Sequence, residues 1–464
     1  MENISFFNFN FDFNFKKALT VCGVGLAILT SAQQWGNTGS SALVSAGNSS
    51  FNNLIVDASG NYYISYYDTT VTKGSVQKFN GTSWSYAGGS AGITTGIATY
   101  NSLTADAQGN IYYSNQASYP NTGMEIRKLS GGSWSSLPMA TTNMMNFHSI
   151  ITSPSNVLFA YSTDGSGTVR RYNSSNGTWE QVGNSGFSGG ATFPKIAVGT
   201  DNVLYASQIT SGLFNVYKIS ANASSSDSWT LAGGVPVGNA YSSDSSFSDI
   251  ALDGNNIPYV VYVSSTAEGR KLNVKKLSGN AWVQIGSANF SDTVVNNTAI
   301  AVTSAGAPYV IASIWDSSNS NHGRNSIYRF NTSSGNWEKF GDPFLSTAAS
   351  TYNDIAIDPV NNYVVAAYSE SGTKVKRLSM NMLGVNDVKN SDHFGIYPNP
   401  TDGIVYLKAE RKIRTVEVSN AVGQVIAAKI SGQQVDISHA PKGVYFVKAT
   451  YEDGKTSVKK LIKK

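Results

Sequence analysis

The stretch Lys78-Phe79-Asn80-Gly81-Thr82-Ser83-Trp84, followed closely by Ala87-Gly88-Gly89, decides how this chain folds. It returns as Lys128-Leu129-Ser130-Gly131-Gly132-Ser133-Trp134. Looser copies of the stretch precede four further tryptophans, Trp179, Trp229, Trp282 and Trp337. Each tryptophan closes a unit of about fifty residues, so the body of the chain is a tandem array.

Within each unit the pattern indicates four short antiparallel strands. In the first unit an apolar run at 54–56 ends in a polar turn at 57–61, and a second strand follows at 62–67. A variable loop leads to a third strand at 75–79, and a Gly/Asn turn leads to the strand that carries Trp84. Alternating apolar and polar residues, the absence of helical periodicity and a charged fraction of only 13% favour an all-β chain. Four such strands per unit are typical of a β-propeller blade.

The number of blades follows from the first strands, of which the sequence has seven. The seventh unit, at 353–379, stops after its third strand and has no tryptophan strand. The missing strand lies at the other end of the chain, where Gln34-Trp35-Gly36 resembles it. Pairing it with the last unit removes two open sheet edges. We therefore predict a seven-bladed propeller over residues 33–379, closed through Trp35.

Both ends of the chain differ from this body. Lys16 and Lys17 precede an apolar run at 18–29 and the small residues of 30–32, which predicts a secretory signal peptide over 1–32. A polar linker is expected at 380–393. Residues 394–464 carry six short alternating strands and are predicted to form a small Ig-like β-sandwich. The single cysteine, Cys22, lies in the predicted signal, and the four histidines are scattered. We therefore expect no metal site and no cofactor. The lysines of the basic tail alternate with apolar residues as on a solvated sheet face, so no nucleic-acid partner is expected either.

The tail resembles the type A C-terminal sorting domain of the type IX (Por) secretion system of Bacteroidetes bacteria. The resemblance rests on Tyr397-Pro398-Asn399-Pro400-Thr401-Asp402-Gly403, on Gly423-Gln424-Val425, on Gly443-Val444-Tyr445-Phe446-Val447-Lys448 and on the terminal Lys463-Lys464. It implies export across both membranes, recognition by the type IX machinery and a secreted or outer-surface location. It also implies that the sorting signal comprises Pro398, Asn399, Pro400, Gly403, Gly423, Gly443, Tyr445, Lys448, Lys463 and Lys464. The body is loosely similar to kelch-like propeller repeats, although it lacks their paired glycines.

A second periodic position lies six residues before the turn that ends each first strand. It is aromatic in six units and Asn297 in the remaining one. The aromatic residues are Phe51, Tyr100, Phe147, Phe193, Phe247 and Tyr352. The first strand of a blade lines the central channel, so these rings should circle one face of the body. They are either wedges between blades or the floor of a binding depression suited to a neutral glycan.

The longest variable loop, residues 313–325, lies on that same predicted face. It holds four candidate binding residues, Trp315, Asp316, His322 and Arg324. Trp315 is outside the repeated tryptophan position, which makes it the strongest single candidate for ligand contact. Asp316 and His322 have no nucleophile or third partner, so the loop has no complete catalytic constellation.

These patterns favour a non-enzymatic secreted or surface protein that binds a glycan or another surface protein through one loop face. Membrane contact is expected only through surface anchoring. Two alternatives stay open: an extracellular polysaccharide hydrolase or lyase, which would need two carboxylates across the scissile bond, and a structural surface protein without a ligand.

Overall fold

The computed structural model describes residues 34–117, 123–243, 245–380, 394–409, 412–420, 424–452 and 456–464. The predicted signal peptide and all of the predicted linker except Met380 lie outside these residues. The chain divides into two compact units, Met1–Met380 and Asn381–Lys464. In the described ranges regular structure is almost entirely β, with two short 3₁₀ helices, η1 (Asp164–Ser166) and η2 (Thr266–Glu268). The predicted all-β class is confirmed.

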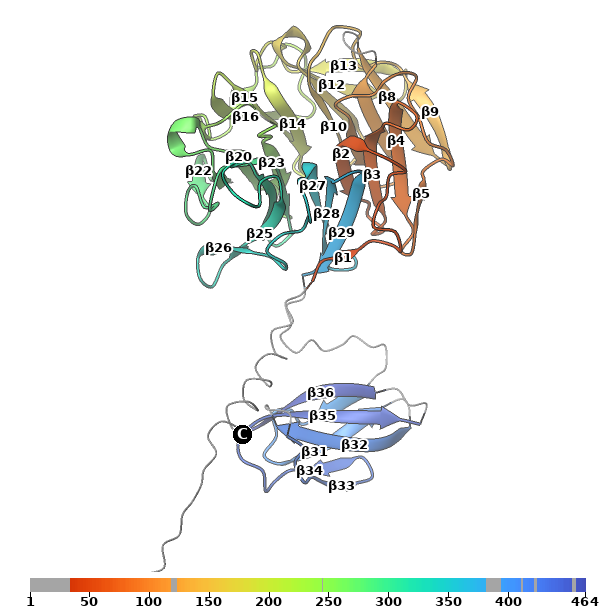
Figure 1. The fold of residues 1–464 in the computed structure, drawn as a ribbon, viewed down its shortest axis with the longest axis vertical. Helices are drawn as coiled ribbons and strands as arrows, with labels where there is room; N and C mark the ends of the chain where they lie inside the picture. Colours follow the sequence, from red (N-terminus) through yellow and green to blue (C-terminus); the bar gives the residue numbers. More distant parts are fainter. Residues whose placement is uncertain are drawn as a thin grey trace, which may run out of the picture. The chain divides into compact units, whose positions relative to one another are not determined.

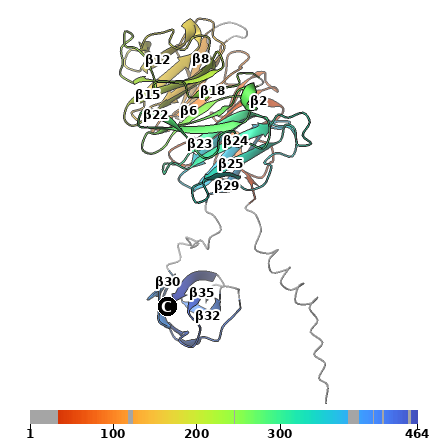
Figure 2. The same cartoon turned by 90° about the vertical axis from the view of Figure 1, so that its left-hand side faces the viewer.

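The described part of the first unit contains seven antiparallel sheets arranged around a common centre (Figure 1), six of four strands and one of five. In five of them strands that follow one another in the chain lie side by side, as Figure 2 shows for β23 to β25. In the five-stranded sheet β18 pairs with β16 instead of β17. The first four sheets comprise β2 (Ser49–Val56), β3 (Tyr62–Asp68), β4 (Lys73–Phe79) and β5 (Trp84–Tyr86); β6 (Ser102–Ala105), β7 (Ile111–Gln116), β8 (Met124–Ser130) and β9 (Ser133–Leu137); β10 (His148–Thr152), β11 (Leu158–Ser162), β12 (Thr168–Asn173) and β13 (Thr178–Val182); and β14 (Thr192–Val198), β15 (Val203–Thr210), β16 (Leu213–Ser220), β17 (Thr230–Leu231) and β18 (Gly238–Asn239). The other three comprise β19 (Asp249–Leu252), β20 (Pro258–Val263), β21 (Leu272–Ser278) and β22 (Ala281–Gln284); β23 (Val295–Val302), β24 (Pro308–Ile314), β25 (Asn325–Asn331) and β26 (Asn336–Lys339); and β27 (Thr351–Asp358), β28 (Tyr363–Ser369), β29 (Thr373–Ser379) and β1 (Gly36–Asn37).

The last of these sheets joins the two ends of the body. Its fourth strand is β1, which pairs antiparallel with β29 so that Gly36 faces Arg377. Thr38 and Val44 extend this junction by donating backbone N–H bonds to the carbonyls of Val375 and Thr373. The predicted pairing of the N-terminal strand with the seventh unit is therefore present.

The repeated tryptophans hold neighbouring sheets together. At all seven repeat positions the indole Nε1–H donates to a backbone carbonyl of the preceding sheet or of the segment that follows it, at 2.7 to 3.3 Å. The acceptors, starting from Trp35, belong to Phe340, Thr38, Ala87, Pro138, Val182, Ala232 and Ile285. The glycine of the repeated stretch makes room for this contact, since a Cβ on Gly88 would lie 2.5 Å from Cδ1 of Trp134. The pattern Trp-x-x-x-Gly, present at six of the seven positions, thus joins neighbouring sheets.

The first strands of the seven sheets line the middle of the unit. Each one lies against the first strand of the next sheet, and the series returns from β27 to β2. The apolar core follows the same plan, because each buried cluster combines side chains of two neighbouring sheets. One such cluster packs Tyr63 and Val76 of the first sheet against Leu103 and Tyr113 of the second. Burial between sheets, rather than inside one sheet pair, is the main apolar stabilisation of the body.

The second unit has two sheets with a shared core. One comprises β30 (Phe394–Tyr397), β31 (Ile404–Ala409), β34 (Gln434–Asp436) and β33 (Lys429–Ser431), in that order. The other comprises β32 (Ile413–Asn420), β35 (Gly443–Tyr451) and β36 (Thr456–Lys463). Buried residues of both sheets, among them Leu407, Val435, Val447 and Leu461, belong to one cluster. Their inward positions alternate with exposed ones, as expected for sheets with one wet face.

Candidate functional site

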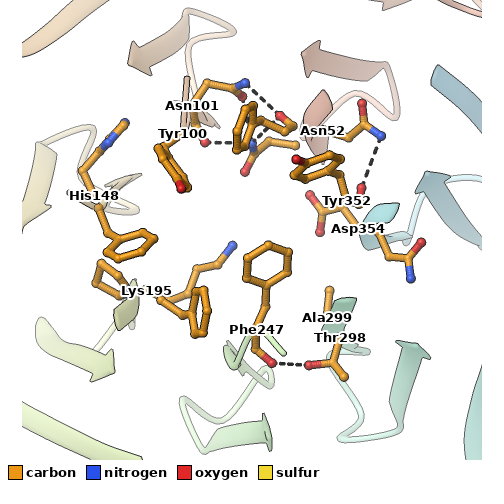
Figure 3. Close-up of a pocket in the computed structure, with 16 residues that line it drawn as sticks. Asn52, Tyr100, Asn101, His148, Lys195, Phe247, Thr298, Ala299, Tyr352 and Asp354 are labelled. Carbon is orange, nitrogen blue, oxygen red and sulfur yellow. Dashed lines mark hydrogen bonds between the residues drawn. The ribbon is translucent and has the colours of Figure 1, made fainter. Parts of the chain in front are cut away.

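The six aromatic residues of the second periodic position meet in the middle of the first unit (Figure 3). Each comes from, or lies just before, the first strand of a different sheet. Successive ring centroids are 4.7 to 5.6 Å apart in the order Tyr352, Phe51, Tyr100, Phe147, Phe193 and Phe247. Such tilted and edge-on pairs are favourable aromatic contacts. We call this set the aromatic ring. Sequence spacing placed its members correctly at one end of the first strands.

Four of these residues have a strained backbone conformation, which sets the direction of their side chains. Phe51, Tyr100, Phe193 and Tyr352 have φ between 49° and 56°, a left-handed region that bulky residues rarely adopt. In β2, β14 and β27 the strand register shifts at this position, which marks a β-bulge. A bulge re-aims a side chain that would otherwise follow the pleat. Each such residue costs roughly 1–3 kcal/mol, and residues of this kind cluster at binding and catalytic sites.

Side chains from the next sheet hold this strained backbone in place. At four of the seven positions the residue that follows the periodic position donates to the backbone carbonyl at that position in the preceding sheet, and three of these four acceptors are left-handed. These bonds are Asn52 Nδ2 to Tyr352 O at 3.2 Å, Asn101 Nδ2 to Phe51 O at 2.8 Å, Asn353 Nδ2 to Asn297 O at 2.9 Å, and Thr298 Oγ1 to Phe247 O. We call these bonds the carbonyl clips. They give buried carbonyls a partner where the bulge interrupts the ladder.

Asn297 interrupts the aromatic ring. It shares the left-handed backbone, with φ 50°, but its side chain is 1% exposed. Its Oδ1 accepts the backbone N–H of Tyr352 at 2.8 Å. The ring is therefore open between Phe247 and Tyr352, where Thr298 and Ala299 face the pocket (Figure 3).

The aromatic ring borders a central pocket. The volume of this pocket is about 100 Å³. Its polar lining includes Asn53, Asn101, Lys195 and Asp354. Aromatic faces with a few convergent polar groups are the usual composition of a small-ligand site.

A second tier of side chains lies two residues after the aromatic position, and the sequence analysis did not identify it. Its members are Asn53, Ser102, Ser149, Lys195, Asp249, Ala299 and Asp354. The same repeat that revealed the aromatic residues contains this tier, so following the register two positions further would have found it. It brings one ammonium and two carboxylates to the first strands of three different sheets.

The two carboxylates bridge neighbouring sheets. Asp249 accepts backbone N–H bonds from Ile250 at 2.9 Å and from Ile300 of the next sheet at 3.1 Å. Asp354 likewise accepts from Ile355 at 2.8 Å and from Leu54 at 2.6 Å. Burial raises the pKa of Asp354 to about 6, while Lys195 and the two N–H donors oppose the shift and Asp249 adds to it. Burial also raises the pKa of Asp249, against Lys195 and its own donors.

Lys195 acts on both carboxylates through its charge but, unlike them, it has no direct hydrogen-bond or ion-pair partner in the described part of the chain. The side chain is half-buried. It rises from β14 and points to the middle of the aromatic ring (Figure 3). Three N–H donors are thus available to a ligand.

His148, which also lines the pocket, is neutral at physiological pH. Burial lowers its pKa to about 4, and the nearby backbone of Ser114 opposes this shift. Neither ring nitrogen has a hydrogen-bond partner of acceptable geometry within the described residues. It therefore adds polarity without charge.

The loop between β24 and β25 lies at the same end of its sheet as the aromatic position, because Val295 pairs with Ile314. Trp315 and His322 stack there with ring centroids 4.9 Å apart. Asp316 accepts from Ser318, N–H at 3.0 Å and O–H at 2.6 Å, and from Thr293 at 2.7 Å. These bonds lower its pKa.

Arg324 also serves this loop. It donates to the Ser346 carbonyl at 3.1 Å and lies over the ring of Phe344 at 4.2 Å. Neither it nor any of the other three predicted loop residues lines the central pocket. The structure thus brings the six aromatic residues together and leaves the loop residues as a separate group.

In the second unit the predicted sorting residues from both ends of the tail meet along β36. Asn399 donates to the Lys460 carbonyl at 2.8 Å and accepts the Ile462 N–H at 2.9 Å. Thr401 continues this contact through backbone bonds with Ile462 and Lys464. Pro398 and Pro400 have no N–H to leave unpaired beside it. The Pro-Asn-Pro segment therefore covers the outer edge of the last strand.

Other predicted sorting residues have mainly structural contacts. Lys463 is 8% exposed, and its Nζ donates to the carbonyls of Ile437, Ser438 and Ala440. Tyr445 donates its hydroxyl to Pro441 O at 2.6 Å. A Cβ on Gly403 would lie 2.5 Å from the Ser438 hydroxyl. Gly443 begins β35, Lys448 and Lys464 are exposed, and Gly423 lies outside the described residues.

Comparison with known proteins agrees with this tail. Residues 395–464 match the family described as secretion system C-terminal sorting domain. This domain marks cargo of the type IX secretion system, so the protein is secreted or attached to the cell surface and interacts with the type IX machinery. Comparison of the sequence with curated proteins gives no match.

Two solved structures resemble the fold. One is a fungal alcohol oxidase of the AA5 family in complex with copper, at 12% identity and a TM-score of 0.52, covering 93% of this chain and all of the other. The second is PorZ, an essential bacterial surface component of the type IX secretion system of Porphyromonas gingivalis. It matches at 12% identity and a TM-score of 0.51, covering 90% of this chain and 60% of PorZ. At this identity the likeness concerns the fold alone.

Two further properties concern the described residues only. None of their helices is long and apolar enough to cross a membrane. Their His, Cys, Asp and Glu side chains form no group of three that could hold a metal ion.

Proposed function

We propose that this chain is a type IX cargo whose body is a seven-bladed, kelch-like β-propeller that binds a saccharide in its central pocket. The proposed organisation is a signal peptide at 1–32, the propeller at 33–379, a linker at 380–393 and an Ig-like sorting sandwich at 394–464. The cyclic series of first strands supports the propeller. So do the seven equivalent tryptophan bonds, with Trp35 in the last sheet.

The observation that carries the binding proposal is the strained aromatic ring around an open pocket. Wedges between blades would need no left-handed backbone, because the ordinary pleat already points alternate side chains toward the neighbouring sheet. Here the strain is retained and held by the carbonyl clips. Aromatic faces suit the apolar faces of a sugar ring, and the amides and charges below them suit its hydroxyl groups.

The raised pKa values of Asp249 and Asp354 favour a second candidate function, hydrolysis of a glycosidic bond. Glycosidases use two carboxyl groups, one of them with a raised pKa, and Asp354 has such a pKa. A structural role accounts for the same geometry, however. Ser102 of the same tier accepts the Ile150 N–H at 3.1 Å across the sheet boundary as the two aspartates do. Release of reducing ends by the wild-type protein, lost in Asp354→Asn, would support hydrolysis over binding alone.

Binding is tested with the full chain on a glycan array, followed by calorimetry with the best ligands. Phe247→Ala removes one aromatic side chain of the pocket at a position whose backbone is not left-handed. Trp315→Ala is the matched aromatic deletion in the loop. We expect Phe247→Ala to weaken binding at least tenfold and Trp315→Ala to leave it within twofold. The opposite result would move the site to the loop and favour a surface-protein or glycan ligand there. Absence of any saccharide ligand would favour the structural alternative.

A further inference from the structure

We propose that the central pocket selects an anionic saccharide unit, a sugar ring that carries a carboxylate or a sulfate, through Lys195. This inference rests on the proposed saccharide function and names the class of ligand within it. Its basis is the position of one ammonium group at the centre of an aromatic enclosure, where no described residue forms a hydrogen bond or an ion pair with it.

The charged groups of the tier are not equivalent. Each aspartate already accepts two backbone N–H bonds, at 2.6 to 3.1 Å, and is engaged in bridging sheets. Lys195 forms no ion pair with either of them. Among the described residues that line the pocket it is the only lysine or arginine. A ligand anion would complete its hydrogen bonding with charge-assisted bonds, which are the stronger kind.

The remaining groups fit the rest of such a sugar. The carboxylate of Asp354 has acceptor sites beyond its two backbone bonds, so it can accept a hydrogen bond from a sugar hydroxyl. The rings of Phe247 and Tyr352, together with Thr298 and Ala299 between them, line one side of the pocket and would contact the sugar ring. A pocket with a volume of about 100 Å³ would hold at most one sugar unit. The pocket would therefore recognise a single acidic unit.

The test compares three oligosaccharide classes of equal length: one with uronate units, one with sulfated units and one neutral. Binding of each to the full-length wild type, Lys195→Met and Lys195→Arg is measured by calorimetry at low and high salt. We expect the wild type to prefer one acidic class at least tenfold over the neutral one, with the preference weakening in salt. Lys195→Met should lose that preference, while Lys195→Arg should keep most of it. The two acidic arms show whether the anion is a carboxylate or a sulfate.

Three results would contradict the inference, and they separate it from the proposed function. Equal or tighter binding of the neutral class would overturn the role of Lys195 but leave saccharide binding intact. An equal loss for all three classes in Lys195→Met would show a structural effect of the substitution, and would also overturn the selectivity. Failure of every class to bind the wild type would overturn both proposals together. Circular dichroism of each variant confirms that the fold is unchanged.

Discussion

The aromatic ring and the loop that carries Trp315 lie at the same end of the body, yet they use their polar residues differently. Around the ring, Asn52 and Asn101 stabilise strained backbone that directs large side chains into a shared pocket. In the loop, the side chains of Asp316 and Arg324 are engaged in hydrogen bonds within the loop and to neighbouring segments, and Trp315 stacks only on His322. A departure from the repeat is therefore not sufficient evidence of a site. Strain repeated at one position is the better indicator.

The largest expected effect in this comparison comes from removing one carbonyl clip. Asn101 is 7% exposed, donates to Phe51 O, and accepts at its Oδ1 from Asn53 at 2.8 Å and Ser65 at 2.7 Å. Asn101→Ala leaves several buried polar groups without this partner, each costing roughly 1–3 kcal/mol. We expect the free energy of unfolding to fall by about 2–4 kcal/mol, measured by urea denaturation.

The matched control lies in the loop. Asp316→Ala removes a comparable number of hydrogen bonds, but at a site open to water that can replace them, so we expect a much smaller loss than for Asn101→Ala. Equal losses for the two variants would show that the carbonyl clips have no special role in holding the ring.

A smaller effect on stability is expected for a substitution that relieves backbone strain and at the same time removes one aromatic side chain from the pocket. Tyr100 has φ 49°, and asparagine tolerates this region better than tyrosine, as Asn297 shows at the same position. Tyr100→Asn should therefore change the free energy of unfolding by no more than about 1 kcal/mol, since relief of strain offsets lost ring contacts. Saccharide binding should nevertheless weaken about tenfold in calorimetry. Retention of full affinity would make the aromatic ring a packing feature.

These contrasts also show what the sequence could predict. Trp spacing predicted the repeated sheets and the pairing of Gly36 with the last of them, because packing between sheets requires a large side chain at one position in every unit. The register likewise placed Phe51 and its equivalents together. Backbone strain at Phe51 was not predictable, since the sequence does not specify φ.

The remaining differences arise because partners distant in sequence decide a side chain's role. Lys195 appears in the sequence as one lysine among many, and only the closed series of sheets brings it near Asp249 and Asp354. Arg324 seemed available for a ligand but contacts Ser346 and Phe344. Lys463 seemed part of a basic signal but is buried against three carbonyls. The seven-blade count and the boundaries of the domains stay predictions.

The smallest expected effect concerns the pH dependence of stability, whose sign should differ between Asp354 and Asp316. The pKa of Asp354, in the pocket, is raised to about 6, so the folded state binds a proton more tightly than the unfolded chain. Its contribution to stability is then greatest at acidic pH and declines as pH rises between roughly 4 and 6. The pKa of Asp316, in the loop, is lowered by Ser318 and Thr293. Its contribution is present at neutral pH and is lost as pH falls through its lowered pKa.

The free energy of unfolding is measured by urea denaturation from pH 4 to pH 7 for the wild type and Asp354→Asn. The wild-type value minus the variant value should fall as pH rises. The same subtraction for Asp316→Asn should give a difference that rises from the acidic end of the range. We expect the first change to be about 1 kcal/mol, less than the roughly 3 kcal/mol that the full rise in pKa would give, because Asp354 is only half-buried beside the open pocket. Lys195→Met should enlarge the Asp354 slope, since the ammonium now opposes the rise in pKa. If the difference changes with pH in the same direction for both variants, the pKa values of Asp354 and Asp316 are shifted in the same direction. Burial in the pocket would then not be what raises the pKa of Asp354.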